Sequence, residues 1–248
     1  MTASTKVVLD VVEDEARFVE TAATAFVDAC REAIAARGKF VVALTGGSTP
    51  VPVHRALGAA PWKDRIDWPR VHVVFGDERA VPPHDARSNF GAAKRDLIDH
   101  VPLPASNVHR MLGESTDLAA AARDYERALV ELCDAKMDLI FVGLGKDAHI
   151  FSLFPGSPMI REEKSLVVAE IDPPMDPAVS RITFTPPMID RAARVLGIAT
   201  GAGKSEAVRR AVEDADDPSR VPAHLIRRAR AARLLVDRAA ASGSKTRG

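Results

Sequence analysis

The stretch MDLIFVGLGKDAH, residues 137–149, contains the pattern that decides the fold. Its apolar run, Met137 to Val142, predicts a buried strand, and the glycines that follow predict a turn carrying a polar cluster. In open α/β sheets, ligands bind where the strands end at the carboxyl edge and helices begin with unpaired N–H groups. His149 therefore lies where a ligand is expected to bind. It is suited to transfer a proton there, because an imidazole exchanges a proton near neutral pH. The alternative is a histidine that only caps a helix beginning near Ile150.

The composition is that of a globular protein with balanced charge. Its 248 residues, 46% of them hydrophobic, are enough for one large α/β domain with a sizeable core. The 34 basic and 34 acidic side chains cancel, so no net field attracts nucleic acid or an anionic membrane surface. No apolar run approaches the roughly 20 residues that a membrane-spanning helix needs. We therefore expect neither a nucleic-acid partner nor a membrane association.

The cysteines and histidines show no metal-binding or disulfide pattern. Cys30 and Cys133 lie far apart and form no C-x-x-C pair, so neither a zinc site nor a disulfide framework is predicted. We expect no catalytic metal and no cofactor, and a reducing, cytoplasmic location is the default expectation. Six histidines are scattered without metal-ligand spacing: His54, His72, His84, His100, His109 and His224.

Strand-like and helix-like segments alternate along the chain. Apolar runs predict strands at residues 6–11, 40–45, 71–75, 138–142, 166–171, 181–185, 195–200 and 233–236. Helical periodicity covers residues 16–36, 51–57, 89–100, 118–133 and 204–212. Most strand candidates are continuously apolar, which predicts a doubly wound, Rossmann-like α/β fold whose mainly parallel sheet has helices on both faces. We assign residues 1–240 to this single domain and expect residues 241–248, which are small or basic, to form a disordered tail.

A glycine turn rich in hydroxyl groups, TGGSTP at residues 45–50, follows the second strand candidate. Gly46 and Gly47 would let the backbone approach a ligand closely. Ser48 and Thr49 would donate hydrogen bonds beside the free N–H groups of the next helix. The pattern predicts an anion cradle, although the same residues would also suit an ordinary turn with a serine or threonine N-cap.

Charged residues end the third strand candidate in the sequence GDER, residues 76–79. Arg79 offers a planar fork that matches phosphate or carboxylate, and Asp77 is suited to orient a histidine or to hold a sugar hydroxyl. The alternative is a surface ion pair between Asp77 and Arg79, which would contribute little.

The sequence TGAGKS, residues 200–205, resembles a nucleotide-binding P-loop, but its spacing excludes one. The P-loop pattern needs a glycine at position 198, which is Ile198. Lys204 is still a suitable point charge for a phosphate at a helix start, or else a solvated lysine. Four strand ends that carry glycine together with His, Arg, Lys and hydroxyl groups predict a site for a small phosphorylated molecule.

These segments, in this order, resemble the 6-phosphogluconolactonase family within the glucosamine/galactosamine-6-phosphate isomerase superfamily. The central loop ends in LFPG at residues 153–156, as in the lactonases, where the deaminases of the superfamily typically have Asn-Glu-Pro-Gly. The motifs that carry the resemblance are residues 44–50, 76–79, 81–82, 85, 88–89, 143–156, 181–183, Lys204 and 222–225.

The resemblance implies hydrolysis of 6-phospho-D-glucono-1,5-lactone to 6-phospho-D-gluconate, in the oxidative branch of the pentose phosphate pathway. It implies a sugar-phosphate lactone as the partner, no cofactor, and a monomer or small homo-oligomer. His149 would pass a proton from the attacking water to the departing ring oxygen, with Asp77 beside it as the second catalytic residue. The resemblance further implies a phosphate held by Gly46, Gly47, Ser48, Thr49, Arg79 and Lys204, and a substrate loop that includes Gly145 and Asp147.

The central loop departs from the family pattern at Ala148 and at Ile150 and Phe151, which replace smaller residues, and two other functions stay open. Ala148 replaces the commoner glycine, which is costly where the backbone needs a positive φ and nearly neutral where it does not. An amino-sugar-phosphate deaminase or isomerase would need a carboxylate that the central loop lacks. A non-catalytic sugar-phosphate-binding protein is the third possibility, and the presence of His149 together with Asp77 argues against it.

Overall fold

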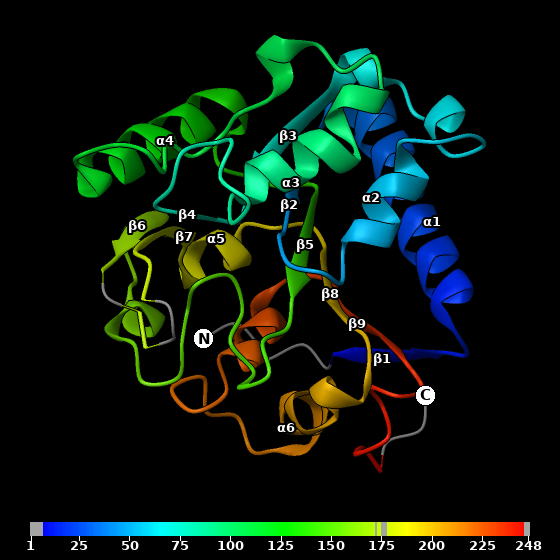
Figure 1. Ribbon diagram of the computed structural model, residues 1–248, viewed down its shortest axis with the longest axis vertical. Helices are drawn as coiled ribbons and strands as arrows, with labels where there is room; N and C mark the ends of the chain where they lie inside the picture. The colour runs from blue at the N-terminus through cyan, green and yellow to red at the C-terminus, as the bar shows by residue number, and fades with distance from the viewer. Residues whose placement is uncertain (1–6, 172, 175–177, 246–248) are drawn as a thin grey trace.

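A sheet of six parallel strands forms the centre of the molecule, in the order β1-β9-β8-β5-β2-β3 (Figure 1). The structure is a computed structural model that describes residues 7–171, 173–174 and 178–245, so Lys6, the expected start of the first strand, lies outside the described residues. Strands β2 and β8 are buried along their whole length, as parallel strands are when both faces are covered. The predicted mainly parallel sheet is confirmed. Its strands are β1 Val8–Val12, β2 Phe40–Leu44, β3 Val71–Phe75, β5 Leu139–Gly143, β8 Val195–Ala199 and β9 Ala232–Asp237.

Helices cover both faces of this sheet, as expected of a doubly wound fold. Side chains of α1, α2 and α3 build one core with Phe40, Val42 and Leu44 of β2. Side chains of α4, α5 and α6 build the other core with Val41 and Ala43 of the same strand. The helices are α1 Glu15–Arg37, α2 Val51–Leu57, α3 Asn89–Asp96, α4 Leu118–Cys133, α5 Pro186–Asp190 and α6 Ser205–Glu213.

Short 3₁₀ turns complete the helical structure. They are η1 Lys63–Arg65, η2 Trp68–Arg70, η3 Ile98–His100, η4 Ala105–Asn107, η5 Pro158–Arg161, η6 Ala202–Lys204 and η7 Pro222–Arg228.

In the described part of the chain, no helix combines the length and the apolar character that crossing a lipid bilayer requires.

The direction in which strands are added reverses between β2 and β5. From β2 the chain adds β3 on one side, then returns to add β5, β8 and β9 on the other side. At such a point the two loops that leave the neighbouring strands diverge and open a crevice at the carboxyl edge of the sheet. The loop after β2 begins at Thr45 and the loop after β5 begins at Leu144, so the crevice lies between them.

A second sheet, which the sequence did not predict, is antiparallel and has the order β4-β7-β6. Its strands are β4 Asp77–Arg79, β6 Val167–Glu170 and β7 Arg181–Phe184. The expected strands at 166–171 and 181–185 therefore belong to this sheet and not to the parallel one. Gly76 joins the two sheets, because its carbonyl accepts a hydrogen bond from Phe184 N at 2.8 Å. A continuous apolar run shows that a strand is buried, but it does not show with which strand it pairs.

One helix is shorter than its periodicity predicted, and another is shifted by one residue. The helix expected over 89–100 ends at Asp96, because Leu97 leaves the helical region with φ −141°, and a 3₁₀ turn follows. The helix expected from Lys204 begins at Ser205, and Lys204 lies in the preceding 3₁₀ turn.

The C-terminal segment differs from the disordered tail expected over 241–248. Residues 241–245 form turns, and Ser244 Oγ and Lys245 N both donate to Glu213, at the end of α6. A Cβ atom added to Gly243 would lie 3.2 Å from the carbonyl oxygen of Ser205, at the start of the same helix. Residues 246–248 lie outside the described residues.

Candidate active site

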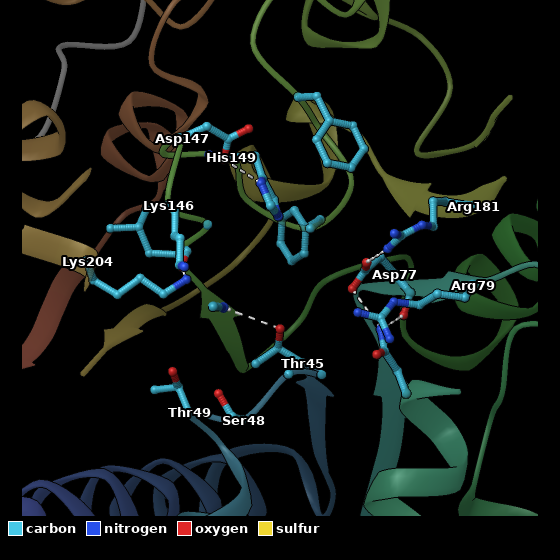
Figure 2. Close-up of a pocket in the computed structure, with 18 residues that line it drawn as sticks. Thr45, Ser48, Thr49, Asp77, Arg79, Lys146, Asp147, His149, Arg181 and Lys204 are labelled. Carbon is cyan, nitrogen blue, oxygen red and sulfur yellow. Dashed lines mark hydrogen bonds and ion pairs between the residues drawn. The ribbon is translucent and has the colours of Figure 1, made fainter. Parts of the chain in front are cut away.

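A pocket of about 430 Å³ lies at the carboxyl edge of the main sheet, between the loops that follow β2 and β5 (Figure 2). The residues predicted at the strand ends therefore lie around one pocket, while the role of each residue remains a prediction. All ten predicted residues line the pocket: Gly46, Gly47, Ser48, Thr49, Asp77, Arg79, Gly145, Asp147, His149 and Lys204.

Several pocket residues were not singled out from the sequence. Asn89 was predicted to start a helix and Arg181 to lie in an apolar strand, and both fall within the motifs that carry the family resemblance, but neither was assigned to the site. Lys146 lies within residues 137–149, next to Asp147, and this position in the sequence could have identified it as a pocket residue. The additional lining residues include Thr45, Asn89, Lys146, Phe151, Phe154 and Arg181.

The loop after β2 is shaped by its glycines. A Cβ atom at Gly46 would lie only 1.8 Å from Asn89 Oδ1, so only glycine fits at this position without displacing that amide. Gly47 has φ +90°, which side-chain-bearing residues rarely adopt. No side-chain hydrogen bond caps α2, so the alternative of a serine or threonine N-cap is wrong.

Asp77 is held in place by buried neighbours and not by His149. One carboxylate oxygen accepts from Asn89 Nδ2 at 3.1 Å and the other from Ser152 Oγ at 2.8 Å. Arg181 forms an ion pair with it at 4.0 Å. The bonded partners of Asp77 are therefore groups other than the imidazole, and its ion pair is with Arg181 and not with Arg79, while its catalytic role stays a prediction.

Glu78 and Arg79 have separate roles. The buried carboxylate of Glu78 accepts hydrogen bonds from the backbone N–H groups of Asn89 and Phe90, at the start of α3. Burial raises the pKa of Glu78 above its ordinary value, although these hydrogen bonds favour the charged form. Arg79 donates to the carbonyl of Arg87, and its buried Nε has no partner among the described residues. Glu78 thus fixes α3, while Arg79 keeps donor capacity for a ligand.

The loop after β5 does not begin a helix, so the expected helix near Ile150 is wrong. Ile150 instead makes isolated bridges to Leu144 and Leu153. Ala148 has φ +69° and Phe151 has φ +51°, and both are buried. Alanine at 148 is therefore the costly case, since a left-handed conformation costs a non-glycine residue about 1 kcal/mol or more.

His149 pairs with Asp147, the carboxylate two residues before it. Its Nδ1 lies 2.6 Å from Asp147 Oδ1, and its ring lies 4.8 Å from that of Phe154. Partial burial alone would raise the pKa of Asp147, but the hydrogen bond and charge of His149 outweigh it, so the net pKa is lowered. An ionised carboxylate only accepts hydrogen bonds, so Nδ1 carries the proton toward Asp147, and in the neutral imidazole Nε2 is the accepting nitrogen.

Gly145 makes room for this pair. A Cβ atom at position 145 would lie 2.1 Å from His149 Nδ1 and 2.7 Å from Asp147 Oδ1. Real Cβ atoms do not approach other atoms so closely. The glycine predicted for the substrate loop therefore permits the contact between the imidazole and its carboxylate.

Lys204 reaches across to the β5 loop. Its Nζ donates to the carbonyl of Leu144 at 2.6 Å. Burial lowers the pKa of Lys204, and the neighbouring charge of Lys146 lowers it further. Thr45, in the loop after β2, also contacts β5, because its Oγ1 accepts from the N–H of Gly143, the last residue of that strand, at 3.3 Å.

Basic groups outnumber acidic ones in the pocket. Its lining includes four basic side chains, Arg79, Lys146, Arg181 and Lys204, but only the two carboxylates Asp77 and Asp147. Among the described residues, no three His, Cys, Asp or Glu side chains come together in a way that could hold a metal ion. The excess positive charge fits a small dianion.

Comparisons with known proteins agree with this geometry. Residues 13–236 match the family model described as glucosamine-6-phosphate isomerases/6-phosphogluconolactonase. A relative from Mycobacterium bovis, named 6-phosphogluconolactonase, is 38% identical over 224 residues, which cover 87% of this chain and 89% of the relative. The probable chloroplastic 6-phosphogluconolactonase 3 of Oryza sativa subsp. indica is 37% identical over 200 residues, 76% of this chain.

The chain spans 60% of the length of that rice relative. Among solved structures, 6-phosphogluconolactonase from Thermotoga maritima is similar with a TM-score of 0.81 and 27% sequence identity. The similarity covers 94% of this chain and 99% of the Thermotoga chain. It therefore extends over nearly the whole fold described above.

Proposed function

The chain belongs to the family of glucosamine-6-phosphate isomerases and 6-phosphogluconolactonases, and we propose that it hydrolyses 6-phospho-D-glucono-1,5-lactone to 6-phospho-D-gluconate. The names of relatives that are 37% and 38% identical support a lactonase. The observation that carries the proposal is the imidazole of His149, which lines a pocket rich in basic groups and has Asp147 on its Nδ1.

His149 acts as the general base and then as the general acid. Its Nε2 takes a proton from water while the water oxygen attacks the lactone carbonyl carbon. The tetrahedral intermediate then breaks the bond to the ring oxygen, which receives the proton from His149. Asp147 keeps the imidazole in the required tautomer and stabilises its protonated form. No covalent intermediate with the protein is needed.

The phosphate anchors the substrate at a distance from the reacting carbon. The Gly46–Thr49 loop supplies backbone N–H groups and two hydroxyls, while Arg79 and Lys204 supply positive charge. Fixing the far end of the sugar places the carbonyl against His149 and removes the entropy cost of finding that orientation. Asp77, bound to Asn89 and Ser152, is positioned to accept a hydrogen bond from a sugar hydroxyl.

The direct test follows the loss of freshly generated 6-phosphogluconolactone against its spontaneous hydrolysis. General acid–base catalysis contributes roughly 10² to 10⁴-fold, so His149→Ala should lose about that much kcat with a similar KM. Arg79→Ala should instead raise KM by about tenfold, because a charge-assisted contact to phosphate is lost. His84→Ala is the matched control, since His84 is an exposed histidine outside the pocket lining.

Three outcomes would contradict the proposal in different ways. A parent rate equal to the spontaneous background would exclude the lactonase activity. A parent-like rate in His149→Ala would remove the assigned proton carrier. Binding of 6-phosphogluconate without turnover would favour a sugar-phosphate-binding protein.

An amino-sugar-phosphate deaminase or isomerase is disfavoured by the central loop. Leu153 and Phe154 are buried and apolar at the place where that chemistry needs a carboxylate. Glucosamine 6-phosphate should therefore not be converted at a measurable rate. The cytoplasmic location and the monomeric or small homo-oligomeric state stay predictions, and the rice relative is named as chloroplastic.

A further inference from the structure

Lys146 and Lys204 come from different loops and meet at one edge of the pocket. The ammonium group of Lys204 is fixed on the carbonyl of Leu144, two residues before Lys146. The side chain of Lys146 folds back over the turn that carries Lys204, because a Cβ atom at Gly203 would lie 3.8 Å from Lys146 Cε. Both lysines line the pocket, and Figure 2 shows them reaching toward the same point.

The protein balances this pair of like charges only in part, because the charge of Asp147 acts on Lys204 without forming an ion pair with it. Within the ranges that the structure describes, neither ammonium group takes part in an ion pair with a carboxylate. Asp147 is the nearest acidic neighbour in the sequence, and its carboxylate is already bound to His149. Two cations held together in this way repel one another until an anion binds between them.

On the opposite wall of the pocket, the protein balances part of the positive charge itself, because Arg181 forms an ion pair with Asp77 at 4.0 Å. Ser48 and Thr49 lie on the same side of the pocket as the two lysines, with Asp77, Arg79 and Arg181 across from them (Figure 2). Hydroxyl donors beside two ammonium groups suit the oxygens of a phosphate dianion.

We propose that Lys146 is a second phosphate-binding lysine, which together with Lys204 makes the site selective for the doubly charged phosphate of the substrate. This inference rests on the proposed function, because it adds one residue to the phosphate site that includes Lys204. Lys146 binds substrate and does not touch the reacting carbon, so it contributes to affinity and not to the chemical step.

The test compares Lys146→Gln with Lys146→Arg and with Lys164→Gln, a change at an exposed lysine outside the pocket lining. One charge-assisted contact to phosphate corresponds to about a tenfold change in affinity. Lys146→Gln should therefore raise KM for the phosphorylated lactone about tenfold with kcat within about twofold of the parent. Lys146→Arg should keep most of the affinity, and Lys164→Gln should match the parent.

Two further readouts separate charge recognition from a structural effect. The dependence of kcat/KM on salt concentration should be shallower in Lys146→Gln than in the parent, because one attractive charge is missing. Affinity for 6-phosphogluconate, measured by calorimetry, should decline at alkaline pH as Lys204 loses its proton. That decline should move to higher pH in Lys146→Gln, since the nearby charge that lowers the pKa of Lys204 is gone.

The outcomes distinguish this inference from the proposed function. A parent-like KM in Lys146→Gln would overturn the role of Lys146 while leaving the lactonase intact. An equal loss with unphosphorylated glucono-1,5-lactone would also overturn it, because the effect would not involve the phosphate. If the parent fails to hydrolyse the phosphorylated lactone, weaker binding of 6-phosphogluconate by Lys146→Gln would still support the two-lysine site, and unchanged binding would refute it.

Discussion

The two walls of the pocket hold their polar groups by different means. On the wall built by β4 and α3, Asp77 and Asn89 are buried, and both carboxylate oxygens of Asp77 accept hydrogen bonds. On the wall built by the β5 loop, Asp147 is half-exposed, and Ala148 and Phe151 have positive φ. The first wall is fixed by buried hydrogen bonds and the second by a strained turn. Substitutions that break the buried hydrogen bonds of the first wall should therefore cost mainly stability, and substitutions in the pair of Asp147 and His149 on the second wall should cost mainly rate.

The largest effect is expected on the β5-loop wall, from Asp147→Asn. An amide can offer an N–H group to His149 Nδ1 and so favour the tautomer that cannot accept a proton at Nε2. We expect kcat to fall about 100-fold, with a melting temperature close to that of the parent. Steady-state kinetics and thermal unfolding of the same sample measure both quantities. A large loss of Tm with normal kcat would reverse the proposed difference between the walls.

The next effect tests the buried wall through Gly46 and Asn89. A methyl group at 46 would collide with Asn89 Oδ1, so Gly46→Ala should lower the free energy of unfolding by about 1–3 kcal/mol. Asn89→Ala removes a donor from Asp77 and should cost a similar amount, about 1–3 kcal/mol.

The double variant sharpens this test, because without the Asn89 amide the collision is relieved. Its loss of stability in urea unfolding should therefore be smaller than the sum of the two single losses. Strict additivity would mean that Gly46 and Asn89 do not contact each other as described.

The smallest effect is expected for Ala148→Gly, on the strained turn. Glycine relieves the positive φ, worth about 1 kcal/mol, but it also removes a buried methyl group worth about 0.8 kcal/mol. Stability and kcat should both stay close to those of the parent. Ala22→Gly is the control, because Ala22 is equally buried but lies inside α1, where glycine costs about 1 kcal/mol. Equal losses in the two variants would show that position 148 is not strained.

The main sheet could be predicted because its strands are continuous apolar runs that alternate with helical periodicity. The antiparallel sheet could not be predicted for a physical reason. β4 is a three-residue polar strand, and it pairs with β7 roughly a hundred positions away, so no local pattern reveals it. The end of α3 at Asp96 was missed similarly, since the apolar periodicity continues through Leu97 and Ile98.

The site was predicted more fully than its internal contacts. Strand ends at one edge of a parallel sheet must lie close together, which brought the residues predicted for all four loops into one pocket. The partner of His149 depended on the turn at Ala148, whose φ +69° cannot be inferred from an alanine. Arg181 and Lys146 were missed because strand register and the fold-back of a lysine side chain are tertiary properties.

The turns after β9 have a practical consequence for handling the protein. Gly243 lies against the first turn of α6, and Ser244 and Lys245 bind Glu213 at its last turn. These residues therefore contact both ends of α6, the helix that directly follows Lys204. Truncation of the chain after Ala240 would remove these contacts with α6. An affinity tag fused at this terminus should for the same reason be separated from residue 245 by a flexible linker.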